Sequence, residues 1–243
     1  MKNRVGRITA SELGEITSAS GKIIDGCVSY IRGKRWERRH GYTLPVSART
    51  MDIGNENESM IFMWAQKHIP GAWVYSKDED LPEIPFWVPE DMPFFGASPD
   101  AYSEDETAVL EFKTLVGNEA TFFFMDEYTP YVDKKARVLK EHGDQIMGLF
   151  LSKPDIMSIT LIKYAYQRDD VPEDRDSPLA DWRGIIFRFE RSDYEVSIEE
   201  MRQRIVLINA MIDTPVDPMQ FKVGSWSLKG GQLTQSIPEP KKK

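Results

Sequence analysis

The stretch that decides the fold covers residues 96–113 and reads GASPDAYSEDETAVLEFK. Short alternating runs of apolar residues stand on either side of the polar segment 103–106, and this pattern predicts a β-hairpin over residues 94–114. A hairpin of this length would bring polar side chains from its two strands next to each other.

The second strand of this hairpin carries both a carboxylate and a lysine. Alternate side chains of a strand share a face, so Glu111 and Lys113 are expected on the same face, roughly 6–7 Å apart along the strand. Leu110 and Phe112 then enter the core from the opposite face. Asp100 begins the partner strand, and the hairpin can bring its carboxylate beside that of Glu111.

Two carboxylates and a lysine at this spacing suit the metal-dependent hydrolysis of a phosphodiester. Mg²⁺ prefers oxygen ligands and keeps part of its water shell. The bound ion lowers the pKa of an attacking water and stabilises charge on the phosphorus, while a nearby lysine can orient or deprotonate that water. The alternative is an ordinary polar hairpin with a solvated salt bridge, because an Asp-x₁₀-Glu-x-Lys pattern is common by chance.

The patterns on both sides of the hairpin predict a mixed α/β domain. Helical spacing of apolar residues and two capping boxes, which begin at Thr9 and Ser197, predict helices over residues 9–16, 23–39, 52–68, 131–152 and 197–212. Runs of β-branched and aromatic residues predict strands over 156–167 and 184–190. Proline-rich or charged segments predict loops over 81–93 and 169–181.

The order of these motifs along the chain resembles a known family. It is similar to the phage lambda exonuclease, or YqaJ-type viral recombinase, branch of the PD-(D/E)XK nucleases. The matching motifs are Arg4-x-Gly6-x-Ile8-Thr9-Ala10-Ser11, Gly54-x-x-x-Glu58, Ser98-Pro99-Asp100, Glu111-Phe112-Lys113 and Gln145. The resemblance implies an α/β fold with a PD-(D/E)XK restriction-endonuclease-like core, in which helices flank a mixed central β-sheet.

The resemblance also implies a metal site. Asp100 and Glu111 would bind one or two Mg²⁺ ions, for which Mn²⁺ would substitute. The main-chain carbonyl of Leu110 or Phe112 would be a further ligand. Glu58 would bind a second ion or its hydration shell.

Two further side chains would complete the catalytic set that the resemblance implies. Lys113 would position or activate the water, and Gln145 would orient either Lys113 or that water. Glu56 competes with Glu58 for its role, because both lie near the same helix start. As an alternative, Glu56 is a helix N-terminal carboxylate that the helix dipole favours.

Family membership would make the protein a 5′→3′ exonuclease that degrades one strand of linear double-stranded DNA. It implies a ring-shaped homotrimer on DNA ends, and a single-strand annealing protein as partner in phage-type recombination. An endonuclease of restriction or repair type is the alternative within the same chemistry. A third possibility is a DNA-binding module with a vestigial site. The intact Glu111-x-Lys113 pair argues against it.

Arg4, Ser11 and Ser98 match an anion pocket that holds the 5′-terminal phosphate in the family. An arginine fork can grip a phosphate bidentately, and hydroxyls satisfy further oxygens. As an alternative, Ser11 merely caps its helix and Arg4 belongs to a frayed terminus. The arginine that the family places shortly after the Glu-x-Lys lysine is absent here. Basic residues further along the chain are the possible replacements: Lys134, Lys135 and Arg137.

A basic cluster over residues 32–39 holds five basic residues against one acidic residue. Its arginines Arg35, Arg38 and Arg39 are expected to contact the DNA backbone. The alternative is a solvated helix face, which is the usual meaning of a charge run. The net charge of −8 excludes a histone-like polycation but leaves room for such a local patch.

Composition limits the remaining possibilities. The length of 243 residues and an apolar content of 41% predict one nuclease domain over residues 1–228, followed by a mobile tail over 229–243. Cys27 is the only cysteine, which excludes a disulfide framework, a multi-cysteine zinc site and a four-cysteine iron–sulfur cluster. The absence of a long apolar run or a signal-peptide core predicts a soluble cytoplasmic protein without a membrane partner, in the bacterial host if phage-encoded.

Overall fold

The computed structural model describes residues 4–16, 26–43, 49–115, 120–165, 181–223 and 225–236. Parts of four predicted features lie outside these residues: the start of the helix at 23–25, the end of the strand at 166–167, most of the loop 169–181, and the end of the tail at 237–243.

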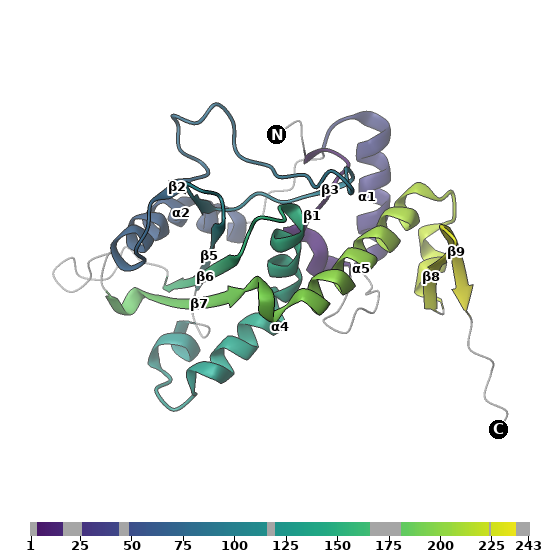
Figure 1. Ribbon diagram of the computed structural model, residues 1–243. Helices are drawn as coiled ribbons and strands as arrows, with labels where there is room; N and C mark the ends of the chain where they lie inside the picture. The colour runs from purple at the N-terminus through teal and green to yellow at the C-terminus, as the bar shows by residue number, and fades with distance from the viewer. Residues whose placement is uncertain are drawn as a thin grey trace, which may run out of the picture.

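A five-stranded mixed sheet forms the centre of the molecule (Figure 1), with the strand order β2-β4-β5-β6-β7. Its strands are β2 (Trp73–Tyr75), β4 (Ala101–Ser103), β5 (Ala108–Leu115), β6 (Ser158–Ala165) and β7 (Gly184–Glu190). β5 and β6 run parallel, whereas the other neighbours are antiparallel. The predicted hairpin is the β4–β5 pair, and β7 has the predicted bounds.

Helices cover both faces of this sheet. The long helices are α1 (Cys27–His40), α2 (Arg49–His68), α4 (Tyr131–Ser152) and α5 (Glu195–Asp213). Buried residues of α2, among them Ile61 and Trp64, pack with Leu110 and Phe112 of β5 on one face. The larger core lies on the other face, where α4 and α5 cover the sheet. The mixed α/β fold with flanking helices is therefore confirmed.

The two faces of β5 divide as the alternation predicts. Leu110 and Phe112 enter the core beneath α2, and Val109 and Glu111 lie on the opposite face. That opposite face is not open to solvent, because α4 covers it and only 2% of Glu111 is exposed. Both faces of a strand beside a parallel neighbour are buried in this way in α/β proteins.

The N-terminal segment lies against the hairpin and α4. β1 (Ile8–Thr9) pairs in parallel with β3 (Phe95–Gly96), just before the Ser-Pro-Asp motif. A 3₁₀ helix, η2 (Ala10–Glu15), follows, and its capping box is formed where the Thr9 amide donates to Glu12 Oε2 at 3.1 Å. The contact with α4 is close: a Cβ at Gly148 would lie 2.7 Å from Ala10 Cβ. The predicted helix after Thr9 is thus present as a 3₁₀ helix.

The remaining short elements connect these layers. They are η3 (Thr121–Met125), η5 (Asp181–Arg183), η6 (Arg191–Asp193) and η7 (Pro218–Lys222). The prediction that α5 starts at the Ser197 capping box is corrected, because Ser197 lies inside the first turn. The Ile198 amide already donates to the Tyr194 carbonyl at 2.8 Å, which makes Tyr194 the residue before the helix.

The C-terminal region contains a further hairpin. β8 (Ser225–Lys229) pairs with β9 (Gln232–Ser236) through Gly230 and Gly231, both at positive φ. Two glycines of this kind form the tight turn that suits a two-residue hairpin loop. Trp226 and Leu233 pack against the main core, so the expected domain boundary after residue 228 falls within an ordered hairpin.

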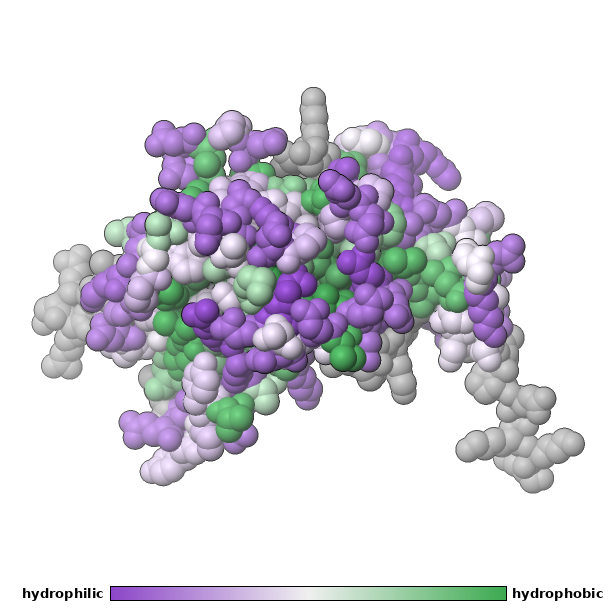
Figure 2. Space-filling model, in the orientation of Figure 1, coloured by the Kyte–Doolittle hydropathy of each residue, from purple (hydrophilic) through white to green (hydrophobic). Residues whose placement is uncertain are grey.

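The surface of the molecule is predominantly polar. Hydrophilic residues cover most of the face shown in Figure 2, and hydrophobic residues gather on it near α5 and the terminal hairpin. Among the described helices, none has the length and apolar character needed to cross a bilayer.

Candidate active site

The β4–β5 register brings two carboxylates to neighbouring positions. Ala101 of β4 pairs with Leu110 of the antiparallel strand β5. Asp100, which precedes Ala101, therefore lies opposite Glu111, which follows Leu110. Asp100 Oδ2 accepts a hydrogen bond from the Phe112 amide at 2.7 Å. Burial raises the pKa of Asp100 well above its usual value, and the charges of Glu111 and Glu58 raise it further.

The Glu111 side chain joins the two other predicted catalytic residues. Its Oε1 atom accepts hydrogen bonds from Lys113 Nζ at 2.7 Å and from Gln145 Nε2 at 2.6 Å. Burial acts to lower the pKa of Lys113, but the charges of Glu111 and Asp100 outweigh it, so the net shift is upward. Glu111 Oε2 is buried and has no hydrogen-bond partner in the described part of the chain. The structure therefore brings β5 and α4 together at this carboxylate.

Glu58 reaches the same site from α2. It stands three and seven residues before Ile61 and Ala65, which are fully buried against the sheet, so it lies on the same helix face. Its Oε2 atom is 2.5 Å from Lys77 Nζ, an ion pair without hydrogen-bond geometry. Burial together with the charges of Glu58 and Asp100 raises the pKa of Tyr75 to about 12.

Two residues near Glu58, Lys77 and Glu56, also bear on the prediction for this site. Lys77 lies two residues after the end of β2, and the sequence did not predict it because no motif includes it. The side chain of Glu56, the predicted competitor of Glu58, lies outside the described residues.

A second lysine lies beside Lys113. Lys163 of β6 is in register with Lys113 on a parallel strand, so the two side chains share a face. Its ammonium group is within hydrogen-bond distance of Glu141 Oε2 at 3.1 Å and His142 Nε2 at 2.9 Å. Burial and the two lysine charges lower the pKa of His142 to about 3, so this imidazole is neutral. The sequence signal for Lys163 was a lone lysine inside an apolar strand.

Lysine side chains and amide groups already contact the three carboxylates of the site. In the described residues, no three histidine, cysteine, aspartate or glutamate side chains have the arrangement of a metal-binding group. Asp100, Glu111 and Glu58 each direct one oxygen to an amide or lysine. The donor chemistry nevertheless fits a hard dication, because the carboxylates repel one another and Glu111 Oε2 has no hydrogen-bond partner among the described residues.

The residues expected to bind a terminal phosphate lie around β1 and β3. Ser98 Oγ is buried without a hydrogen-bond partner in the described residues, two positions before Asp100. Arg4 is exposed, with its guanidinium 5.8 Å from the centroid of the Phe86 ring. Ser11 is exposed on η2, and its hydroxyl lies 3.2 Å from that of Thr9. Within the described part of the chain, Arg4, Ser11 and Ser98 are not joined to one another by hydrogen bonds.

Two arginines of the basic cluster on α1, Arg35 and Arg38, hydrogen-bond to other parts of the fold. Arg35 donates to the carbonyls of Met211, Ile212 and Val216, which lie at and just beyond the end of α5. Arg38 donates to Gly6, Asn209 and Asp213. Helix ends leave such carbonyls without intrahelical partners, and the two arginines supply donors. Of the three arginines predicted to contact DNA, Arg39 is the one that is exposed.

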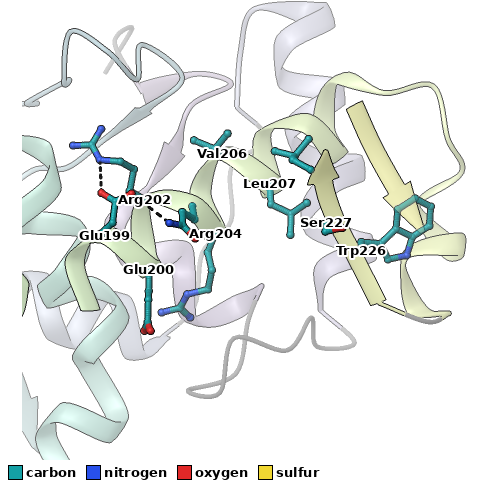
Figure 3. Close-up of a pocket in the computed structure, with 10 residues that line it drawn as sticks. Glu199, Glu200, Arg202, Arg204, Val206, Leu207, Trp226 and Ser227 are labelled. Atoms are coloured by element: carbon teal, nitrogen blue, oxygen red, sulfur yellow. Dashed lines mark hydrogen bonds and ion pairs between the residues drawn. The ribbon is translucent and has the colours of Figure 1, made fainter. Parts of the chain in front are cut away.

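A groove of about 930 Å³ lies elsewhere, between α5 and β8 (Figure 3). Charged residues of both signs line it, including Glu199 and Arg202, together with Leu207 and Trp226. None of the predicted catalytic or phosphate-binding residues belongs to its lining. Its size alone therefore does not make it the site of phosphodiester chemistry.

The fold defined by this sheet and its helices is that of solved exonucleases. An alkaline exonuclease from Laribacter hongkongensis, LHK-Exo, matches with a TM-score of 0.62 and 16% sequence identity, over 90% of this chain and 94% of its own. The same enzyme in complex with dAMP matches with a TM-score of 0.58 and 18% identity, over 91% and 95% of the two chains. A phage-related exonuclease from Haemophilus somnus gives 0.57 and 16% identity, over 85% and 93%.

These likenesses establish the fold rather than the activity. The expected resemblance to the lambda exonuclease branch is confirmed at the level of the fold. Comparison with models of known families finds no match, and comparison with curated protein sequences finds none either. A fold hosts several functions, so the activity has to be argued from the site.

Proposed function

We propose that this protein is a Mg²⁺-dependent exonuclease that degrades one strand of linear duplex DNA. The observation that carries the proposal is the Glu111 carboxylate, which binds Lys113 and Gln145 and faces Asp100 across the hairpin. These groups occur in a fold shared with exonucleases, including one solved with a nucleoside monophosphate, dAMP.

Each side chain then has a distinct task. Asp100 and Glu111 would hold the ion, together with a main-chain carbonyl of β5, and Glu58 would support a second ion or its water shell. When bound, Mg²⁺ supplies a water of lowered pKa and stabilises charge on the phosphorus. Gln145 holds one oxygen of Glu111 in place, so that its other oxygen keeps a fixed direction.

Lys113 acts on the water and the phosphate. Its ammonium group carries three donors, of which the Glu111 contact uses one. The others orient the attacking water and place positive charge beside the phosphoryl oxygens, where negative charge grows in the transition state.

We further propose 5′→3′ polarity, set by a 5′-phosphate pocket of Arg4, Ser11 and Ser98. The buried Ser98 hydroxyl supports this, because no described residue hydrogen-bonds to it and it lies two residues from Asp100. A ring trimer and an annealing partner in phage-type recombination follow from the resemblance to the lambda exonuclease family.

The test uses end-labelled linear, nicked and covalently closed circular duplexes with Mg²⁺ or Mn²⁺. The wild type is expected to release nucleotides from linear DNA and to leave the closed circle intact. Glu111→Ala and Lys113→Ala are expected to abolish release, whereas Glu104→Ala, an exposed carboxylate of the same hairpin, keeps it. Cleavage of the closed circle identifies an endonuclease instead, and full activity of either catalytic-site variant refutes the assignment.

A further inference from the structure

Three polar side chains form a line on one face of α4. Arg137, Glu141 and Gln145 are spaced by four residues, which places them one above another on a helix. Gln145 ends the line at the active site, where it donates to Glu111. Arg137 lies eight residues away, about 12 Å along the helix axis.

Glu141, the middle residue of this line, is held in place by Lys163 of the sheet. Glu141 Oε2 accepts from Lys163, whose side chain is 3% exposed, and Glu141 Oε1 accepts from Arg137 Nε at 2.7 Å. The Lys163 contact and the Arg137 contact both lower the pKa of Glu141, against the effect of its burial. Because Lys163 is fixed within β6, Glu141 is a stable acceptor for the arginine.

The guanidinium of Arg137 is therefore oriented on two sides. Its Nε is bonded to Glu141, and its Cζ lies 4.2 Å from the centroid of the Phe122 ring. The side chain is 38% exposed, and no hydrogen bond in the described part of the chain uses its two terminal nitrogens. A stacked guanidinium with a free fork matches the geometry of a phosphate group.

Two neighbouring lysines of α4, Lys134 and Lys135, make other contacts. Lys134 is buried and donates to the carbonyls of Phe123 and Asp126. Lys135 lies 5.0 Å from the centroid of the Phe189 ring. Neither of them offers an exposed pair of donors aligned with Gln145.

We propose that Arg137 binds a backbone phosphate of the DNA strand that enters the active site. The proposal rests on the proposed nuclease function and adds a strand-binding residue to it. At a rise of 3.4 Å per base pair, 12 Å along α4 places this phosphate at most about four base pairs from the scissile bond. Glu141 and Lys163 act as positioning residues behind this contact.

Fluorescence anisotropy of a 5′-phosphorylated duplex in EDTA measures binding without cleavage. Arg137→Ala is expected to weaken binding about three- to tenfold and to reduce the salt dependence by about one counterion. Arg137→Lys is expected to restore the salt dependence but only part of the affinity, because it keeps the charge and loses the fork. Arg188→Ala is the matched control, since Arg188 is 65% exposed and lies on the other face of the sheet from α4.

A methylphosphonate scan locates the contact. Neutralising one phosphate at a time near the end is expected to remove the Arg137→Ala penalty at a single position within about four nucleotides. A penalty equal to that of Arg188→Ala, or one that no single methylphosphonate removes, overturns the inference while wild-type digestion stands. Failure of the wild type to bind or digest duplex DNA refutes the proposed function itself.

Discussion

Asp100→Asn is expected to stabilise the metal-free protein while abolishing its nuclease activity. Asp100 is partly buried opposite Glu111, and both desolvation and its carboxylate neighbours raise its pKa. Opposed side chains in an antiparallel pair lie about 5 Å apart, so two charges in a medium of effective dielectric about 20 repel by about 3 kcal/mol. Lys113 offsets part of this repulsion. An asparagine keeps an acceptor for the Phe112 amide and removes the charge.

The expected net gain is about 1–2 kcal/mol, which corresponds to a rise in Tm of roughly 3–6 °C for a chain of this size. The gain depends on pH. Because the folded state holds the Asp100 proton more tightly than the unfolded chain, wild-type stability falls as the pH rises above about 4. The two proteins should therefore differ little near pH 4 and most at pH values above the raised pKa of Asp100.

The assay is thermal unfolding in EDTA at acidic and neutral pH, repeated with Mg²⁺. Asp105→Asn is the matched control in the same hairpin. Hydrogen bonds from Ser103 and Thr107 lower the pKa of Asp105, so this change should leave Tm equal or lower at neutral pH. A fall in the Tm of Asp100→Asn in EDTA would refute the repulsion argument. Equal stabilisation of wild type and Asp100→Asn by Mg²⁺ would show that Asp100 does not bind the ion.

Three further outcomes are expected. Gly148→Val should lower Tm and slow digestion, because a Cβ there lies 2.7 Å from Ala10 Cβ and pushes η2 away from α4; unchanged unfolding in urea would contradict this. Leu110→Ala should cost about 2–5 kcal/mol of unfolding free energy, measured by urea titration, since Leu110 is fully buried between β5 and α2; a much smaller loss would mean that this face of the sheet repacks. Wild-type protein should digest 5′-phosphorylated ends faster than 5′-hydroxyl ends, and Arg4→Ala should reduce the difference; equal wild-type rates would remove the phosphate pocket and leave the nuclease assignment unaffected.

Local patterns predicted the central elements well. The bounds of α4 and β7 agree with the sequence prediction, because long periodic or β-branched segments specify their own conformation. The alternation of β5 also separated Glu111 from Leu110 and Phe112 correctly. Residue types and spacing suggested Asp100, Glu111 and Lys113 as a metal-dependent site, and the resemblance to the lambda exonuclease branch added Glu58 and Gln145 to the predicted set.

Other assignments depended on partners that are distant in the sequence. The charge run on α1 suggested that Arg35 and Arg38 contact DNA. In the structure, the C-terminal end of α5 lies beside them and accepts hydrogen bonds from both side chains. Local sequence could not reveal this, because the same arginines would be solvated if α5 packed elsewhere. The β8–β9 hairpin was missed for a related reason: its polar strands are ordered by Trp226 and Leu233 against the main core.

The sequence by itself predicted the kind of fold and the chemical groups of the candidate site, through local periodicity, residue type and the order of motifs that resembles a known family. Only the tertiary structure decided which groups meet. The parallel register of β5 and β6 places Lys163 beside Lys113, and the packing of α4 on the sheet brings Gln145 to Glu111. Strand register and helix packing arise from contacts between segments that are far apart in the chain. Local sequence patterns therefore do not predict them.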